Sequence, residues 1–215
     1  MTKRIFIVGG NGFAKECVQY VRWNIANGDN IELGGLVGHN GYVVDFGALN
    51  ELFVGDLSQM KFGSDDYCVI GAGYPELRRK IYDDIKKYGG KFFTLCSPGF
   101  FVPEGVDLGE GNIFIATQLN GYTGIKIGNG NLFNGTSSVG HDSKIGDFNF
   151  FGPCSQILGD VKIGDDNIVG ANAILLPHAK LGNNNKIAPL SCVYRGCKDN
   201  CYMIGNPAEK VGTVE

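Results

Sequence analysis

Apolar residues recur at every sixth position through the second half of the chain. The unbroken series consists of Ile127, Phe133, Val139, Ile145, Phe151, Ile157, Ile163, Val169, Leu175, Leu181, Ile187 and Val193. An amphipathic helix repeats its apolar face every three or four residues, so a period of six excludes a helix. The period predicts a hexapeptide β-helix, in which eighteen residues form one triangular coil and each apolar side chain points inward. We expect successive coils to stack about 4.8 Å apart.

The beginning of this repeat is out of phase with the rest. Val102, Leu108 and Phe114 are six residues apart, but they precede the later series by one position. One extra residue between Gln118 and Gly121 would reconcile the two, which predicts a first coil with a small bulge. The alternative, a chance run within an ordinary all-β domain, would require twelve successive matches.

The first part of the chain has the pattern of alternating strands and helices. An apolar run at 4–8 leads into a glycine-rich turn, and helical spacing follows over 14–23, with Cys17, Val18 and Val21 as candidate core residues. Further strands are expected at 31–37, 66–70 and 91–96, and a helix is expected at 75–87. A strand, a glycine-rich turn and a helix form the start of a βαβ nucleotide-binding unit. The fold class predicted is an α/β Rossmann-like domain at 1–97 and an all-β parallel β-helix at 98–215.

The glycine-rich turn at 9–12 is a candidate phosphate site, because free N–H groups at a helix start favour anions. Lys15 stands where a dinucleotide fingerprint usually has a third glycine, and no acidic residue ends the second strand, which argues against a standard NAD site. His39 is a candidate for contacting a base, with an exposed loop histidine as the alternative. Arg78 or Arg79 is a candidate phosphate ligand, with a solvated helix face as the alternative.

Composition narrows the class of protein. The 215-residue chain has a net charge of -3 and a pI near 5.6, so it lacks a basic surface for nucleic acid. Its seven cysteines are odd in number and scattered without a CxxC pair, which predicts reduced thiols, a cytoplasmic location and no metal site. The N-terminus does not resemble a signal peptide. No apolar run reaches the roughly 18 residues of a membrane span.

His141 and Asp142 lie within the regular repeat. Acyl transfer to an amine needs a group that takes a proton near neutral pH, and an imidazole suits this role. A turn at 140–142 would let Asp142 orient the imidazole, although neighbouring side chains on a strand point to opposite faces. No cysteine or serine lies in a nucleophile motif, so direct attack by the amine is preferred. Either Gly152 or Gly159 is a candidate to stabilise the oxyanion.

His178 follows Pro177 on a later coil and has no acidic neighbour in the sequence. We therefore expect His178 to be structural or to lie at the rim of the site.

The glycine-rich βαβ start, the hexapeptide repeat with its His-Asp pair, and the Gly-Asn-Pro-Ala ending at 205–208 occur together. In this combination the chain resembles, over nearly its whole length, the sialic acid O-acetyltransferase / bacillosamine N-acetyltransferase family of sugar acyltransferases. It is most similar to nucleotide-linked 4-amino-4,6-dideoxysugar N-acetyltransferases, such as those acting on UDP-bacillosamine precursors, GDP-perosamine or dTDP-viosamine. The resemblance implies a left-handed β-helix, a homotrimer, and acetyl-CoA bound between neighbouring β-helices. It also implies a sugar nucleotide held by the N-terminal domain, in lipopolysaccharide or O-antigen biosynthesis.

The resemblance also implies roles for individual residues. His141 would be the general base and Asp142 its partner. The acetyl-CoA groove would include Phe150, Gly159, Ala171 and Pro189, and the sugar nucleotide would contact Asn11, Gly12, Phe13, Val37, Gly38 and Gly73. The family often has a second histidine where Phe150 stands, and some relatives have base-binding acids where Val37 and Gly38 stand. Phe150 removes one possible hydrogen bond to the thioester, and without an acid at residues 37 and 38 the identity of the nucleobase stays open.

The leading hypothesis is an acetyl-CoA-dependent N-acetyltransferase acting on a nucleotide-linked 4-amino sugar. An O-acetyltransferase acting on a sialic acid or a related sugar would use the same base on a hydroxyl. A non-catalytic trimeric scaffold would use the β-helix for assembly alone. The sugar stereochemistry, the acyl chain length and the nucleotide stay open from the sequence.

Overall fold

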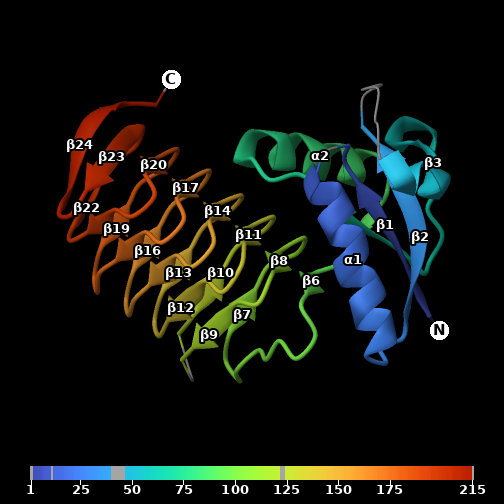
Figure 1. Ribbon diagram of the computed structural model, residues 1–215, viewed down its shortest axis with the longest axis horizontal. Helices are drawn as coiled ribbons and strands as arrows, with labels where there is room; N and C mark the ends of the chain where they lie inside the picture. Colours follow the sequence, from blue (N-terminus) through green and yellow to red (C-terminus); the bar gives the residue numbers. More distant parts are fainter. Residues whose placement is uncertain (1, 11, 40–46, 122–123, 215) are drawn as a thin grey trace. The chain divides into compact units, whose positions relative to one another are not determined.

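The computed structural model describes residues 2–10, 12–39, 47–121 and 124–214. The chain divides into two compact units, Met1–Pro98 and Gly99–Glu215. The boundary expected from the sequence, after residue 97, lies one residue before this division. Figure 1 shows helices and strands in the first unit and stacked coils in the second. The expected contact at Asn11 lies outside the described residues.

The first unit is built on a five-stranded sheet in the order β3-β2-β1-β4-β5, and every strand pair in it is parallel. Its strands are β1 (Lys3–Val8), β2 (Ile31–Gly38), β3 (Phe53–Asp56), β4 (Asp66–Ile70) and β5 (Lys91–Phe92). The other elements are α1 (Gly12–Ala26), α2 (Pro75–Lys87), β6 (Leu95–Cys96) and the 3-10 helices η1 (Gly47–Leu52) and η2 (Leu57–Gln59).

Most of the expected elements of the first unit are present. Cys17, Val18 and Val21 are buried on α1, as their spacing predicts. Strand β3 was not expected, because both Phe53 and Val54 are exposed at the edge of the sheet and so show no alternation. The expected strand at 91–96 is instead two separate two-residue strands, β5 and β6.

The strand order reverses between β1 and β4. The chain passes from β1 through α1 to β2 on one side, while β4 lies on the other side of β1. Gly9 follows β1 and Gly71 follows β4, and the lack of side chains on these two residues lets the two turns lie close together. A Cβ on Gly9 would lie 2.9 Å from the carbonyl carbon of Gly71, and a Cβ on Gly71 would lie 2.9 Å from the Cβ of Ala14. In open parallel sheets, such a reversal leaves a crevice at the carboxyl ends of the strands, where ligands bind.

The second unit is a stack of coils with three sheet faces, in which the strands pair in parallel except for the last pair at the C-terminal end. The first face contains β7 (Asp107–Leu108), β10 (Lys126–Ile127), β13 (Lys144–Ile145), β16 (Lys162–Ile163), β19 (Lys180–Leu181) and β22 (Gly196–Cys197). The second face contains β8 (Ile113–Phe114), β11 (Leu132–Phe133), β14 (Phe150–Phe151), β17 (Ile168–Val169), β20 (Lys186–Ile187), β23 (Cys201–Gly205) and β24 (Ala208–Thr213). The third face contains β9 (Gln118–Asn120), β12 (Ser138–Gly140), β15 (Gln156–Ile157), β18 (Ile174–Leu175) and β21 (Cys192–Val193).

The period of six is confirmed. All twelve residues of the apolar series are buried, with at most 5% of their surface exposed. At the corners, every sixth residue from Thr136 to Leu190 has a φ between 52° and 65°. This left-handed conformation turns the chain from one face to the next, and Asp, Asn and His tolerate it better than most residues.

The first coil differs from the expectation in two places. Leu119, the buried residue of β9, follows Phe114 by five positions and precedes Ile127 by eight. The net shift is the single residue that the sequence requires, but it combines one residue fewer before Leu119 with two more after it. Val102 is 41% exposed and belongs to no strand, so the expectation that it starts the repeat is wrong.

Two columns fill the inside of the coils. The rings of Phe114, Phe133 and Phe151 are stacked, with centroids 4.9 and 4.5 Å apart. A second column consists of buried asparagines, each of which accepts the backbone N–H of its successor through Oδ1: Asn112, Asn131, Asn149, Asn167 and Asn185. The last member accepts the N–H of Cys201 at 2.7 Å. The column therefore satisfies buried amides from coil to coil.

The end of the stack is a hairpin in which β23 and β24 pair in antiparallel fashion. The Gly-Asn-Pro-Ala motif forms its turn, with a cis peptide bond between Asn206 and Pro207. Across the described part of the chain, no helix has the length and apolar character needed to span a membrane. All seven cysteines are free thiols. Burial raises the pKa of Cys17, Cys68 and Cys96 to about 12, so these three are protonated at neutral pH.

Candidate active site

His141 and Asp142 form a hydrogen-bonded pair at the corner between the third and first faces. Nδ1 of His141 lies 2.8 Å from Oδ2 of Asp142, and the two side chains are 67% and 57% exposed. Asp142 has a φ of 58°, so the chain turns here and adjacent side chains can meet. The turn expected from the sequence is therefore present. A carboxylate that accepts the proton on Nδ1 leaves a lone pair on Nε2.

Glycines surround this pair closely. A Cβ on Gly159, on the next coil, would lie 2.6 Å from Cε1 of His141, so the ring lies directly over this glycine. A Cβ on Gly121 would lie 2.8 Å from Cα of His141, and a Cβ on Gly124 would lie 3.1 Å from Cα of Asp142. The ring orientation thus depends on the absence of side chains at these positions.

The backbone hydrogen bonds distinguish the two candidate oxyanion donors, Gly152 and Gly159. The N–H of Gly152 donates to the carbonyl of Val169 at 2.8 Å and belongs to the coil ladder. Gly159 is outside the strands, and the backbone bonds of the described chain include none from its N–H, whereas its neighbour Asp160 donates to the carbonyl of His141 at 2.8 Å. Gly159 is therefore the candidate with an available donor, next to the imidazole.

A second imidazole–carboxylate pair lies on the same corner. Nδ1 of His178 is 2.9 Å from Oδ2 of Asp160, on the preceding coil. The bond to His178 is the main reason that the pKa of Asp160 is lowered. The expectation that His178 lacks an acidic neighbour is wrong in space, because eighteen residues make one coil. That spacing is the signal in the sequence that could have revealed the pair.

The residues expected along the acetyl-CoA groove fall into three places. Gly159 lies on the corner of His141. Ala171 and Pro189 are one coil apart on a different corner, between the second and third faces, and Phe150 is half-buried on the second face. Their exposure increases along the chain, from the half-buried Ala171 to the exposed Pro189. On one chain, therefore, these residues do not surround the base.

Among the described residues, those expected to contact the sugar nucleotide lie at the carboxyl ends of β1, β2 and β4 or just after them. Gly12 begins α1 and Gly73 precedes α2, and a Cβ at either position would meet nothing within 4 Å. Phe13 is half-buried on the first turn of α1. Val37 is completely buried, and its carbonyl accepts the N–H of Gly9 at 2.9 Å. The Val37 side chain is therefore not available to a ligand.

Asp56 is a residue that the sequence reasoning missed. It ends β3 in register with Gly38, and a Cβ on Gly38 would lie 3.6 Å from its Oδ2. Oδ1 of Asp56 accepts the N–H and hydroxyl of Ser58 at 3.0 and 2.7 Å. A carboxylate thus lies beside Gly38, but it comes from a strand that the sequence did not predict.

Two basic residues expected at a ligand or in solvent are buried. His39 is 4% exposed, and its Nε2 lies 2.7 Å from Oδ2 of Asp84 on α2, so it is neither a base-stacking residue nor an exposed loop histidine. Arg78 is completely buried and donates from Nη1 to the carbonyls of Ile70 and Ala72 at 3.0 and 2.7 Å. Burial lowers the pKa of Arg78 to about 10, which still leaves it charged at neutral pH. It supports the end of β4 and is not a solvated phosphate ligand.

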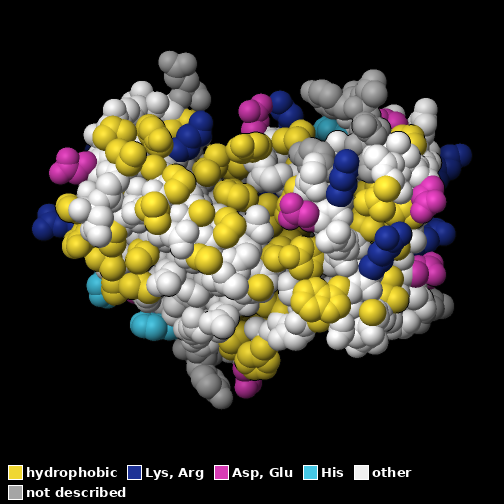
Figure 2. Space-filling view, viewed as in Figure 1, with side chains coloured by type: hydrophobic (Ala, Val, Ile, Leu, Met, Phe, Trp, Pro, Cys, Tyr) yellow, Lys and Arg dark blue, Asp and Glu magenta, His cyan; other side chains and the backbone are white. Residues whose placement is uncertain are grey.

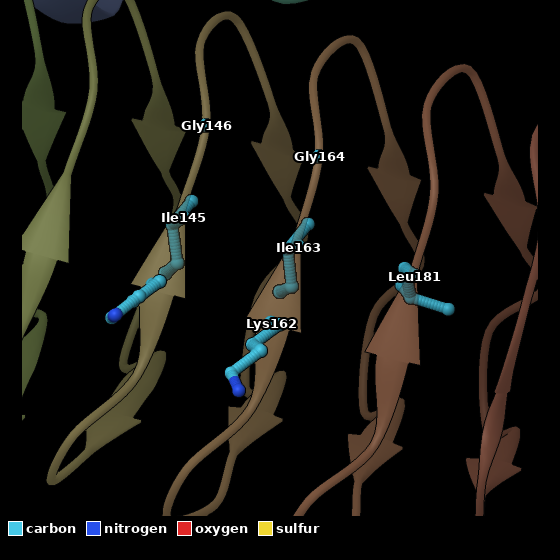
Figure 3. A pocket seen from close by; sticks show the side chains of 7 residues that line it. Ile145, Gly146, Lys162, Ile163, Gly164 and Leu181 are labelled. Atoms are coloured by element: carbon cyan, nitrogen blue, oxygen red, sulfur yellow. The ribbon is translucent and has the colours of Figure 1, made fainter.

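A column of exposed lysines runs along the first face, in register from strand to strand: Lys126, Lys144, Lys162 and Lys180. Two of them border an open hollow of about 400 Å³ with Ile163 and Leu181. Figure 3 shows Lys162 extending from β16, with Ile145, Ile163 and Leu181 at equivalent places on successive coils. His141 does not line this hollow, so the imidazole corner is a separate feature. Figure 2 shows histidine side chains at the surface over the coils.

Within the described ranges, no three His, Cys, Asp or Glu side chains are grouped so that they could hold a metal ion. The polar groups at the corner are the imidazole of His141, the carboxylate of Asp142 and the backbone N–H of Gly159.

Known proteins resemble the chain mainly in structure. The profile for the bacterial transferase hexapeptide (six repeats) matches residues 160–195. No curated protein sequence matches. The acetyltransferase domain of PglB from Neisseria gonorrhoeae FA1090, in complex with acetyl coenzyme A, superimposes with a TM-score of 0.84 at 18% identity, covering 98% of this chain and 100% of that one.

Two further structures are similar. One is a histidine-to-asparagine variant of perosamine N-acetyltransferase from Caulobacter crescentus, in complex with CoA and GDP-perosamine. Its TM-score is 0.84 at 23% identity, covering 99% of this chain and 98% of that one. WeeI from Acinetobacter baumannii AYE has a TM-score of 0.82 at 23% identity, covering 97% and 100%. At these identities the likeness is one of fold.

Proposed function

We propose that the protein is an acetyl-CoA-dependent N-acetyltransferase that acts on the 4-amino group of a nucleotide-linked 4-amino-4,6-dideoxyhexose. The observation that carries the proposal is the exposed His141–Asp142 pair, whose imidazole lies over Gly159 at a coil corner. The fold is shared with neighbours described as acetyltransferases, including structures that hold acetyl-CoA or CoA together with GDP-perosamine. Both the fold and the corner chemistry fit acyl transfer.

In the proposed reaction the neutral amine attacks the thioester carbonyl while Nε2 of His141 takes a proton from the nitrogen. Asp142 keeps the proton of Nδ1 in place and stabilises the imidazolium that forms. The tetrahedral intermediate then collapses, its carbon–sulfur bond breaks, and the thiolate of CoA receives the proton from Nε2. General base catalysis of this kind contributes about 10²- to 10⁴-fold to a rate. No covalent intermediate on the protein is needed.

The N–H of Gly159 is the proposed oxyanion donor. It belongs to the residue over which the imidazole packs, so base and donor can act on one carbonyl group. A fixed donor is most effective where negative charge develops in the transition state. Gly152, the other candidate, already donates within the coil ladder.

We propose that acetyl-CoA lies between two copies of the chain in a homotrimer of left-handed β-helices. The separation of Gly159 from Ala171 and Pro189 onto different corners supports this arrangement. A groove that uses both corners must bring the corner of one copy next to another corner of its neighbour. A closed ring of three copies repeats the same contact three times.

The first unit is proposed to be a Rossmann-like sugar-nucleotide site. Its strand order reverses beside Gly9 and Gly71, and the N-terminus of α1 begins at Gly12. The N–H groups at a helix start favour a diphosphate. The proposed contacts are Gly12, Phe13, Gly38 and Gly73, together with Asn11 from the sequence.

The first test is turnover of acetyl-CoA with a panel of UDP-, dTDP- and GDP-linked 4-amino-4,6-dideoxysugars. We expect His141→Asn to lower kcat at least about 100-fold while binding of acetyl-CoA is retained. Asp107→Asn, an exposed carboxylate on the first coil, is the control for surface substitution. Turnover near that of the wild type in His141→Asn would remove the general base from the proposal.

Two further measurements separate the alternatives. If 4-hydroxy sugars and sialic acids are better acceptors than 4-amino sugars, the protein is an O-acetyltransferase. If calorimetry detects no binding of acetyl-CoA, a scaffold role replaces the enzyme. Light scattering that gives a monomer would contradict the shared groove.

A further inference from the structure

The imidazoles of His141 and His178 come from coils that are not adjacent, and both contact the coil between them, at the neighbouring residues Gly159 and Asp160. His141 extends forward, and its ring lies over Gly159. His178 extends back, and its Nδ1 bonds to Asp160 at 2.9 Å. The backbone continues this link, because the N–H of His178 donates to the carbonyl of Gly159 at 3.1 Å. The intermediate coil therefore carries one imidazole from each side.

The imidazole ring of His178 is oriented relative to its carboxylate in the same way as the ring of His141. In both, Nδ1 faces a carboxylate, which directs Nε2 away from the bond. The side chain of His178 is 77% exposed, so its Nε2 is accessible. An imidazole whose Nδ1–H is held by a carboxylate presents an acceptor at Nε2. The ligand group that it suits is therefore an N–H or O–H donor.

The charges around Asp160 support this orientation. Lys162 and Lys180 both add to the effect of His178 in lowering the pKa of Asp160, which stays ionised. An ionised carboxylate is the stronger acceptor for the Nδ1 proton.

We propose that His178, positioned by Asp160, accepts a hydrogen bond from an amide N–H of the pantetheine arm of acetyl-CoA. This inference rests on the proposed function. The proposed groove residues Gly159, Ala171 and Pro189 lie on successive coils beyond that of His141. With this groove, the arm extends along the stack toward the later coils, and His178 lies two coils beyond His141 on the same corner. His178 thus contributes to binding of the acyl donor and takes no part in proton transfer to the acceptor.

The test compares three variants of His178 with the wild type. His178→Asn keeps a donor to Asp160 but loses the group at Nε2, and His178→Gln places an amide oxygen near Nε2. We expect Asn and Ala at residue 178 to raise the Kd for acetyl-CoA about 3- to 10-fold and Gln to restore most of the affinity. The kcat and the KM for the amino sugar should change less than about twofold. Asp160→Asn should resemble His178→Asn.

Truncated donors locate the contact. S-Acetyl-N-acetylcysteamine has one amide of the arm, and the acetyl thioester of propanethiol has none. The inference is supported if His178→Asn lowers kcat/KM with acetyl-CoA or S-acetyl-N-acetylcysteamine, which contain amides, but does not lower it with the propanethiol thioester. An equal loss with all donors, a raised KM for the sugar, or unchanged Kd values in Asn and Ala variants would overturn it. If the wild type itself does not bind acetyl-CoA, the proposed function fails and this inference fails with it, whereas equal binding by wild type and His178→Asn overturns this inference alone.

Discussion

The imidazole of His141 lies over the backbone of Gly159 so closely that no Cβ fits between them. The two residues are eighteen positions apart, one full coil of the helix. The ring therefore has its orientation set by contacts with two coils: Asp142 on its own coil and Gly159 on the next.

Replacing Gly159 with alanine should displace the imidazole from this position. We expect Gly159→Ala to lower kcat about 100-fold, since a shift of about 1 Å in a catalytic group has effects of this size. Steady-state kinetics would measure it. Gly212→Ala is a matched control, because a Cβ there meets only Cβ of Tyr202 at 4.0 Å. A Gly159→Ala variant that is as active as Gly212→Ala would show that the ring position is not required.

Removing the partner of the imidazole should have a smaller effect. In Asp142→Asn the amide no longer fixes the proton on Nδ1, so we expect kcat to decrease about 10- to 100-fold with the KM for acetyl-CoA nearly unchanged. Asp160→Asn, one coil away, should show the opposite division between kcat and KM. The same kinetic pattern in both variants would mean that the two carboxylates do not have separate roles.

Arg78 should matter for stability more than its place in a nucleotide-binding domain suggests. Its two bonds to the carbonyls of Ile70 and Ala72 are buried, so Arg78→Met leaves acceptors unsatisfied. We expect a loss of about 2–4 kcal/mol in the free energy of unfolding, measured by urea denaturation. Arg79→Met, at the next position on the same helix, is the control. Equal stability of the two variants would contradict the assigned role.

The pair of Arg4 and Asp66 should make stability depend on pH in the acid range. The hydrogen bond from Arg4 is the main reason that the pKa of Asp66 is lowered. The stabilisation is complete above the ordinary carboxyl range near pH 4 and is lost as the pH falls through the lower folded-state pKa. We expect Asp66→Asn to cost about 1–2 kcal/mol at pH 7, discounted because Arg4 is half exposed, and progressively less below pH 4. Asp65→Asn is the control, and a loss that stays constant down to pH 2 would contradict the linkage.

Repulsion between the charges of the lysine column should lower the free energy of unfolding. Lys162 has Lys144 and Lys180 directly opposite it on the two neighbouring strands. We expect Lys162→Glu to raise the free energy of unfolding by about 0.5–1 kcal/mol, with the gain reduced in 1 M salt. Lys186→Glu is the control, because its strand partners are Ile168 and Tyr202. No gain, or an equal gain in both, would exclude repulsion within the column.

Much of the fold could be predicted because its rules are local. The period of six determines the coil, and the glycine-rich turn after a strand indicates the βαβ start. Strand β3 escaped prediction because Phe53 and Val54 lie exposed at a sheet edge. The shift in the first coil was located wrongly, because a net change of one residue does not reveal that one position is lost and two are gained.

The sequence predicted the part of the candidate site that is formed by residues adjacent in the chain. His141 and Asp142 are adjacent in the chain, so their pairing was within reach of a pattern argument. The His178–Asp160 pair and the approach of Asp56 to Gly38 depend on which strands lie side by side. Burial of Arg78 likewise follows from how α2 packs on β4, which the helix pattern alone does not reveal.

The buried asparagine column runs through the coils that carry both imidazoles, from Asn131 to Asn185. In a linear array, each coil gains stability only from its two neighbours. A single substitution such as Asn167→Ala would therefore weaken the junction between the coils of His141 and His178 and let the two halves of the array melt at different temperatures. The alignment of the two imidazoles therefore depends on the stacking of the coils between them. That stacking is stabilised by asparagine side chains at a different corner from the one that carries His141 and His178.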